Sequence, residues 1–451
     1  MYAPSALPPE NSQMARDTAT LPQALRGPLS ERVARTAMDP NELLRYRQAV
    51  RQWVPVADER YRCCSYLPLG ADIPAVRIGV KDTADIAGWP TRLGLPHHRA
   101  YPDTTASVLR GLPVDALFAK LVTTQLSVGR ASGCVNPYFP AVDPAGSSTG
   151  SAVAVAANIC DVALGTDVLG SVRFPAGCCG VVALRMTHHP ALLPGLLTVS
   201  PVLDAPGWIT RTVADLAYVW EQFGLDHTIP TLRSRGGTRT VGVVADVFGE
   251  DCDDDVVAAV HNVDALARAG GLGVRSVDLS TIWHSRADAW RMCAYDTERL
   301  GQRWSAEVGD ELDEATRAAF GLIAPVRSAR YAAVQDELHR VRSLVTELFD
   351  NHGVDAWLMP LSQRLPVPTG TIAATVPTIL NPSDALFARR LGFTSLASAA
   401  GLPAVCFPIG VDLKRQTPIP IQLVGPPGSE TALIEIAARI AAQVELHLLP
   451  R

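Results

Sequence analysis

Two glycine- and serine-rich loops decide the fold prediction. Residues 165–173 read Gly-Thr-Asp-Val-Leu-Gly-Ser-Val-Arg, and residues 145–151 read Ala-Gly-Ser-Ser-Thr-Gly-Ser. The small residues 151–157 follow the earlier loop and predict a tightly packed helix, and the apolar residues 162–164 then predict a buried strand. The two loops are therefore expected to lie at the ends of buried elements of one α/β core.

Strand and helix patterns alternate along much of the chain. The helix predicted at 253–271 begins with three aspartates, which favour a helix N-terminus, and ends at a Gly-Gly pair. Such alternation favours a sheet covered by helices, which is an α/β fold. The predicted strands are 75–80, 162–164, 181–184, 240–247, 274–279, 355–359, 404–407 and 419–424, and the other predicted helices are 39–62, 430–444 and long amphipathic segments between 283 and 350.

Composition limits the function classes. Forty basic residues face 45 acidic ones, for a formal net charge of −5, so a broad electrostatic grip on nucleic acid is not expected. The apolar stretch 151–165 is too short to cross a membrane, and residues 1–30 predict a flexible N-terminal arm with no secretory signal. Nine cysteines show no Cys-x-x-Cys spacing, so we expect no metal site, no disulfide scaffold and a reducing cytoplasm.

A lysine stands upstream of the two loops, where Gly79-Val80-Lys81-Asp82 ends a predicted strand. A phosphate-binding loop would need a lysine after the glycines, and neither loop has one. A serine hydroxyl needs a base to become a nucleophile, and no histidine lies near either loop in the sequence. A neutral, buried Lys81 is a suitable base, because burial lowers the pKa of an ammonium group.

Taken in order, these segments resemble the amidase signature family. Ser147 and Ser171 are 24 positions apart, as in that family. The likeness is good over 75–220 and moderate over 355–440. The matching segments are Gly79–Asp82, Gly146–Ser148, Gly165–Asp167, Gly170–Pro175, Cys179–Val182, Leu203–Gly207, Arg211–Asp215, Ala400–Ala404 and Pro420–Gly425.

The resemblance implies a fold and its division along the chain. It implies a single large α/β domain over 31–451, with a mixed β-sheet core flanked by helices on both faces. Within it we expect a catalytic core over 75–220, a variable substrate-side region over 225–350, and closing strands and a helix over 355–445.

The resemblance also implies roles for individual residues. Ser171 would be the nucleophile, Ser147 would bridge protons after a cis peptide bond, and Lys81 would be the base. The backbone amides of Val168, Leu169 and Gly170 would form the oxyanion hole. No cofactor and no metal are implied; the expected partner is a small-molecule amide, and the resemblance is compatible with a homodimer.

Several positions depart from the family pattern. Leu169 stands where the family has glycine, Ala145 replaces the first glycine of a pair, and Arg185 replaces a lysine. Arg173 is interpreted as pairing with Asp167 to hold the loop, in preference to binding a substrate carboxylate. These departures leave four interpretations: an amide hydrolase, a biosynthetic acyltransferase or amide-forming enzyme, an amidotransferase-type subunit or inactive interaction protein, and an unrelated α/β binding protein.

Overall fold

The computed structural model describes residues 21–70, 72–225, 238–323 and 328–444. Most of the predicted N-terminal arm, residues 1–20, lies outside the described residues. The remainder, 21–30, packs against the domain with Leu21, Leu25 and Leu29 buried.

The described strands form one mixed sheet in which both parallel and antiparallel neighbours occur. This confirms the predicted α/β fold with a mixed core. In their order across the sheet, the strands are β1 (Cys64–Tyr66), β3 (Leu117–Leu121), β2 (Ile78–Lys81), β4 (Val162–Asp167), β6 (Ala205–Thr210), β5 (Val182–Arg185), β10 (Ala404–Asp412), β11 (Thr417–Val424), β9 (Ala356–Pro360), β7 (Thr240–Val244) and β8 (Gly273–Val277).

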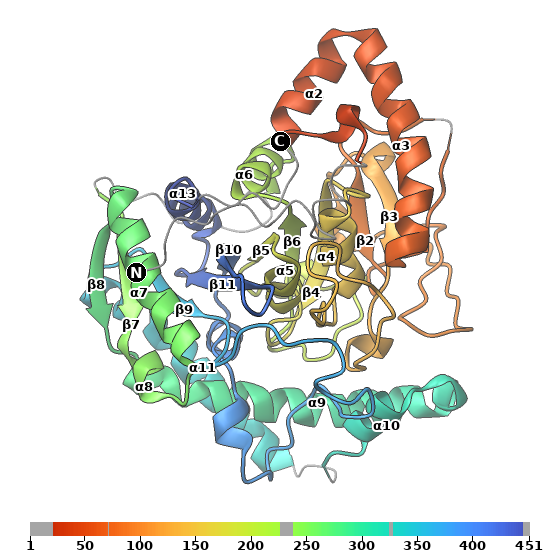
Figure 1. Cartoon of the computed structure of the whole chain (residues 1–451). Coiled ribbons are helices and arrows are strands. Elements are labelled where there is room, and N and C mark those ends of the chain that lie inside the picture. Colours follow the sequence, from red (N-terminus) through yellow and green to blue (C-terminus); the bar gives the residue numbers. More distant parts are fainter. Residues whose placement is uncertain (1–20, 71, 226–237, 324–327, 445–451) are drawn as a thin grey trace.

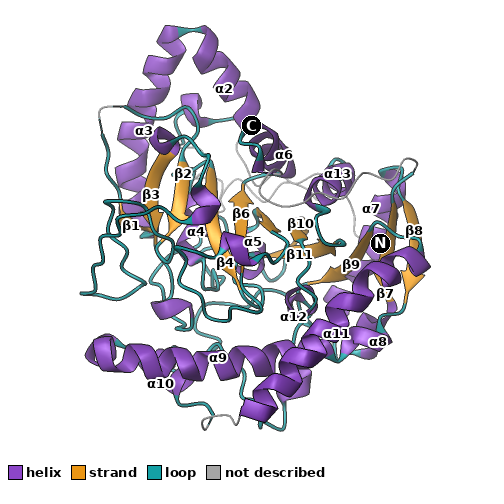
Figure 2. Ribbon diagram, turned by 180° about the vertical axis from the view of Figure 1, so that it is seen from behind, coloured by secondary structure: helices purple, strands orange, loops and turns teal. Residues whose placement is uncertain are grey.

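Helices cover both faces of the sheet, as expected (Figures 1 and 2). One apolar layer joins α6, α7 and α13 to the sheet, and a second joins α3, α4 and α5 to it. The described helices are α2 (Leu29–Met38), α3 (Pro40–Tyr61), α4 (Thr149–Ala156), α5 (Arg173–Cys179), α6 (Val213–Gln222), α7 (Asp254–Ala269), α8 (Ser280–Trp283), α9 (Ser285–Val308), α10 (Glu314–Phe320), α11 (Ser328–His352), α12 (Thr394–Ala399) and α13 (Glu430–Ala441).

Helix α4 consists of small residues because it packs tightly against neighbouring segments. All eight are buried, and a Cβ on Gly150 would lie 2.5 Å from the Val122 nitrogen and 2.6 Å from the Cys63 carbonyl oxygen. Glycine therefore lets the first turn of α4, just after Ser147, pack directly on the backbone of its neighbours.

The directions of the strands place Lys81, Asp167 and Asp204 at the same edge of the sheet. Strands β2 and β4 are parallel, so their carboxyl ends, Lys81 and Asp167, lie at the same edge. Strand β6 is antiparallel to β4, and Ala205 pairs with Asp167, so Asp204 reaches that edge as well. Helix α9 runs along the lower side of the molecule in Figure 1.

Candidate functional site

Lys81 is fully buried at the end of β2 and makes two side-chain hydrogen bonds. Its Nζ donates to Ser147 Oγ at 2.7 Å and to Thr166 Oγ1 at 2.8 Å. Thr166 comes from the end of β4, so the parallel pairing of β2 and β4 creates the second contact. The structure thus joins Lys81 to the loop of Ser147, which is 66 positions away in sequence.

Burial lowers the pKa of Lys81 to about 7, and the negative charges of Asp204 and Asp167 oppose that shift only in part. The cause is the loss of hydration of the ammonium group. Near neutral pH a substantial fraction of Lys81 therefore carries a free electron pair and can accept a proton.

Ser147 is held by its backbone. The Gly146–Ser147 peptide bond is cis. The Ser147 carbonyl accepts hydrogen bonds from Thr123 Oγ1 at 3.0 Å and from the Thr124 amide at 3.3 Å. With 4% of its surface exposed, Ser147 points its hydroxyl to Lys81 and not to bulk water.

Ser171 follows Gly170 and lies two positions before α5. It is half-buried, in contrast to Lys81 and Ser147, so it is the serine of the pair that a solute reaches more readily. Its carbonyl accepts a 3.1 Å hydrogen bond from the Ser148 amide, which ties the two serine loops together. The structure therefore brings all three predicted catalytic residues to one place.

The loop before Ser171 presents two amides without protein partners. Among the described residues, the amides of Val168 and Leu169 donate to no protein group. The third predicted donor, Gly170, directs its amide to Asp167 Oδ1 at 2.9 Å. Gly170 has a φ of +124°, and a Cβ there would lie 2.6 Å from the Phe174 ring, so only glycine fits this turn.

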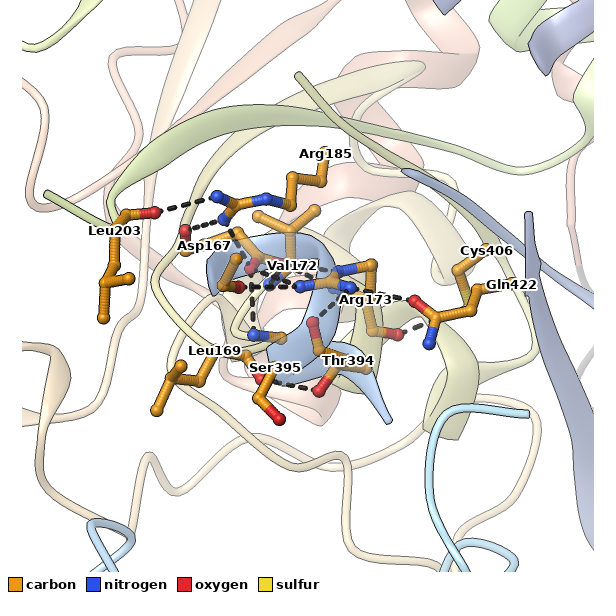
Figure 3. A network of polar contacts seen from close by, with 12 residues as sticks. Asp167, Leu169, Val172, Arg173, Arg185, Leu203, Thr394, Ser395, Cys406 and Gln422 are labelled. Carbon is orange, nitrogen blue, oxygen red and sulfur yellow. Dashed lines mark hydrogen bonds and ion pairs between the residues drawn. The ribbon is translucent and has the colours of Figure 1, made fainter. Parts of the chain in front are cut away.

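A buried ion network holds that loop in place (Figure 3). The Asp167 carboxylate pairs with Arg173 and with Arg185, each at 2.9 Å. Burial raises the pKa of Asp167, but the two guanidinium groups outweigh it and hold the pKa well below its usual range. The pairing expected for Arg173 is confirmed. Arg185, noted only as a departure, also donates to the Asp167 and Leu203 carbonyls.

Asp204 is a residue to which the sequence motifs gave no role. It is buried, and its Oδ2 accepts the Ser200 amide at 2.9 Å, whereas Oδ1 has no hydrogen-bond partner among the described residues. Burial raises the pKa of Asp204 to about 7, against the opposing effect of the Ser200 and Val199 amides and of Lys81. A second proton-binding group therefore interacts electrostatically with Lys81.

One side of the loop before Ser171 is apolar. Val168 and Leu169 belong to a buried cluster that also contains Met292, Tyr295 and Trp304 of α9. Leu169 is 6% exposed, so its side chain is packed within that cluster and does not extend into solvent. The aromatic side chains of Tyr295 and Trp304 therefore pack against other buried side chains beside the loop of Ser171.

Metal ligands do not gather around Lys81. Within the described ranges, the two groups with metal-ligand spacing are Asp58 with Cys63 and Cys64, and His284 with Asp288 and Glu337. Neither group contains a residue of the serine loops. In the same part of the chain, no helix has both the length and the hydropathy that a bilayer crossing requires.

Sequence comparison relates this chain to known proteins. The model of the family described as Amidase matches residues 73–434. A 2-amino-5-chloromuconic acid deaminase of Comamonas testosteroni is 32% identical over 326 residues, or 68% of this chain and 66% of that protein, just under two thirds of its length. The glutamyl-tRNA(Gln) amidotransferase subunit from Synechococcus sp. is 33% identical over 341 residues, covering 67% of this chain and 68% of that protein.

Solved structures share the fold. A 6-aminohexanoate cyclic dimer hydrolase in complex with substrate superposes with a TM-score of 0.78 at 21% identity, covering 95% of this chain and all of that one. The glutamyl-tRNA(Gln) amidotransferase subunit from Thermotoga maritima gives 0.72 at 20% identity, covering 94% of this chain and 96% of that one. At these identities the likeness concerns the arrangement of helices and strands.

Proposed function

Because the chain belongs to the amidase signature family, we propose that it hydrolyses a carboxylic amide through an acyl-enzyme on Ser171. The observation that carries the proposal is the 2.7 Å hydrogen bond between the buried Lys81 Nζ and Ser147 Oγ. A lysine with a pKa near 7 is suited to draw a proton from a serine at physiological pH.

In the first half-reaction Ser171 Oγ bonds to the amide carbonyl carbon. Its proton passes to Ser147 Oγ, and the Ser147 proton passes to Lys81 Nζ. The carbon–nitrogen bond then breaks, and the leaving amine takes a proton back through Ser147. Splitting the reaction into acylation and deacylation replaces one difficult step by two easier ones.

Water completes the cycle by the same path. It attacks the Ser171 ester while Ser147 and Lys81 accept its proton, and the proton returns to Ser171 Oγ as the carboxylic acid leaves. The net reaction is amide plus water to acid plus amine. No metal or cofactor is needed to balance it.

Backbone amides would stabilise the negative oxygen of each tetrahedral intermediate. We assign this role to the free amides of Val168 and Leu169, and we give Gly170, whose amide is engaged by Asp167, the role of shaping the turn. One such donor is typically worth about 3 kcal/mol of transition-state stabilisation.

A serine-directed fluorophosphonate probe and a panel of primary amides test the proposal. Wild-type chain should carry one probe adduct at Ser171 by peptide mass spectrometry and release ammonia from at least one amide. Ser171→Ala should lose both, and Ser147→Ala should label much more slowly. The matched control is Ser151→Ala, which should still label. Ser151 lies in α4, and its hydroxyl donates to the Leu164 carbonyl of β4. Labelling of Ser171→Ala at the wild-type rate would disprove the assignment.

A second function is favoured by the relatives named as amidotransferase subunits. In that case the ammonia would pass to a partner and not to solvent. Copurification from the native host, followed by identification of a stable partner and of glutamine-dependent activity, distinguishes the two. Both functions, amide hydrolysis and ammonia transfer to a partner, would use the acyl-enzyme on Ser171. Probe labelling therefore does not distinguish them, whereas a stable partner protein does.

A further inference from the structure

Two thiols and a carboxylate gather where α3 ends, with a third thiol beside them. Arg62 takes a left-handed conformation, with φ of 53°, and turns the chain back after the helix. This turn brings the donor atoms of Asp58, Cys63 and Cys64 within 4.8 Å of one another. Residues separated by five and six positions thus form a cluster that no Cys-x-x-Cys spacing would reveal.

The spacing of the donors suits a tetrahedral cation. Cys63 Sγ lies 3.7 Å from Asp58 Oδ1. Zinc binds thiolate sulfur at about 2.3 Å and carboxylate oxygen at about 2.1 Å, so two such ligands of a tetrahedral ion lie roughly 3.6 Å apart. The observed distance therefore needs little adjustment to accept the ion.

The carboxylate is already oriented by its surroundings. Asp58 Oδ1 accepts the amides of Cys63 at 3.1 Å and Cys64 at 2.8 Å. Ligating carboxylates in metal sites are held by hydrogen bonds of this kind, which fix the ligand before the metal arrives. The cluster is therefore built and not merely a chance approach of flexible side chains.

Cys134 lies beside the cluster on a separate segment. Its Sγ donates to the Arg62 carbonyl at 3.2 Å, and the Val135 amide donates to the Tyr61 carbonyl at 3.0 Å, which fixes the segment against the end of α3. The Cys134 thiol interacts electrostatically with both Cys63 and Cys64. Cys64 and Cys134 are half-buried, so an ion can reach them from solvent.

We propose that Asp58, Cys63, Cys64 and Cys134 form a binding site for a thiophilic divalent cation of the Zn²⁺ type. Thiolate is the ligand that such ions prefer, and the carboxylate completes four-fold coordination. On binding, three thiol protons leave to solvent and three sulfur–metal bonds form, with no change of oxidation state. The guanidinium of Arg62 offsets part of the negative charge that results.

The other cluster of potential ligands does not support the same inference. His284 Nε2 and Arg340 both contact Glu337, at 2.7 and 2.6 Å, and Arg291 contacts Asp288 at 2.7 Å. Its carboxylates are therefore already neutralised by cations of the protein. In the α3 cluster, by contrast, three of the four donors are thiols, which are the softer ligands.

Zn²⁺ binding to the reduced full-length chain tests the proposal, with a chromophoric chelator as competitor. We expect one tight site, and Zn²⁺ should protect the half-buried Cys64 and Cys134 from alkylation. Cys64→Ser, Cys134→Ser and Asp58→Asn should each weaken binding at least about tenfold, since loss even of a residue that only orients a ligand costs that much. Asp58→Asn retains a side-chain oxygen that can accept the Cys63 and Cys64 amides. A loss of Zn²⁺ affinity in this variant therefore measures the contribution of the carboxylate charge.

The control is Cys252→Ser. Cys252 is also half-buried and also donates to a backbone carbonyl, that of Val247, but lies far along the chain in another segment. This variant should bind Zn²⁺ as the wild type does. Equal affinity in all four variants, or protection of other cysteines, would overturn the proposal. A Zn²⁺-dependent rise in Tm, present in wild type and absent in Cys64→Ser and Cys134→Ser, supplies a readout independent of amide turnover.

Discussion

Thr394 donates a 2.6 Å hydrogen bond from its hydroxyl to the backbone carbonyl of Leu169. The other side of the same peptide group, the Gly170 amide, is held by Asp167 Oδ1 at 2.9 Å. One peptide plane is therefore clamped from both sides, immediately before Ser171 (Figure 3). Because the orientation of this plane sets where the neighbouring amides point, Thr394 of α12 would support the proposed oxyanion contacts through the Leu169 peptide group.

Thr394→Val should lower kcat for amide hydrolysis by about tenfold with little change in KM. The valine keeps the shape of the side chain and removes the donor, so the Leu169 peptide becomes free to tilt. We expect a smaller effect than the removal of a whole oxyanion donor, which costs ~3 kcal/mol of transition-state stabilisation. Steady-state kinetics on one amide measure it. Ser395→Ala, which removes a neighbouring hydroxyl bonded to the Leu391 carbonyl, is the control and should keep its kcat.

The rate of acylation should rise with pH through about 7 and then level off. The proposed proton acceptor is neutral Lys81, and burial lowers its pKa to about 7, so the active fraction should grow as pH rises past that value. The probe-labelling rate of Ser171 between pH 5.5 and 9 measures it. Lys81→Arg should not restore the rate at any of these pH values, because guanidinium stays protonated. A flat profile with an active Lys81→Arg would contradict the role of Lys81 as the base.

Replacing Lys81 by methionine should stabilise the fold while abolishing activity. The pKa of Lys81 falls from 10.5 in the unfolded chain to about 7 in the fold, so the unfolded state binds more protons between these values. Stability of the wild type therefore rises from pH 7 towards pH 10, and the charged lysine costs a few kcal/mol below pH 7. Denaturant unfolding should show the gain of Lys81→Met largest at pH 6 and shrinking by pH 9.5. A gain that is equal at both pH values would mean that Lys81 is not desolvated.

Asp204→Asn should move the acid limb of the rate profile to lower pH. The negative charge of Asp204 favours the protonated form of Lys81, and asparagine removes that charge while keeping an oxygen for the Ser200 amide. The labelling rate at pH 6 should therefore increase relative to its own plateau. A limb that stays in place would show that Asp204 is protonated, and thus neutral, throughout the range.

The sequence pattern predicted most of the strands but missed three, the short β1 and the longer β3 and β6. In β3 the buried Lys120 interrupts the apolar run, and only the structure shows that Asp82 neutralises it at 3.1 Å. In β6 Pro206 and Gly207 argue against a central strand. Buried charges and strand prolines depend on partners elsewhere in the chain, so local pattern could not reveal these two strands.

The candidate site shows the same limit. Motif order was sufficient to select Lys81, Ser147 and Ser171, because each stands in a distinctive segment. Thr166 lies inside a quoted segment, yet its contact with Lys81 depends on the parallel register of β2 and β4. Thr394 lies more than 200 positions from Leu169, and nothing in its local sequence marks it. Supporting residues are defined by the fold, whereas the residues proposed to react are marked in the sequence.

Leu169→Gly should widen the range of acyl groups that the enzyme accepts. The Leu169 side chain is buried in the apolar cluster with Met292 and Tyr295 of α9, so its removal opens space in the loop just before Ser171, the proposed nucleophile. The same change should cost a few kcal/mol of stability, because a buried leucine is lost and glycine adds freedom to the unfolded chain. The measurement is kcat/KM over an amide series graded in acyl size. Leu169→Met, which nearly conserves volume, should retain the wild-type profile. Identical size profiles for wild type and Leu169→Gly would show that Leu169 only packs the loop, and labelling of Ser171 without hydrolysis of any amide would favour acyl transfer to an amine.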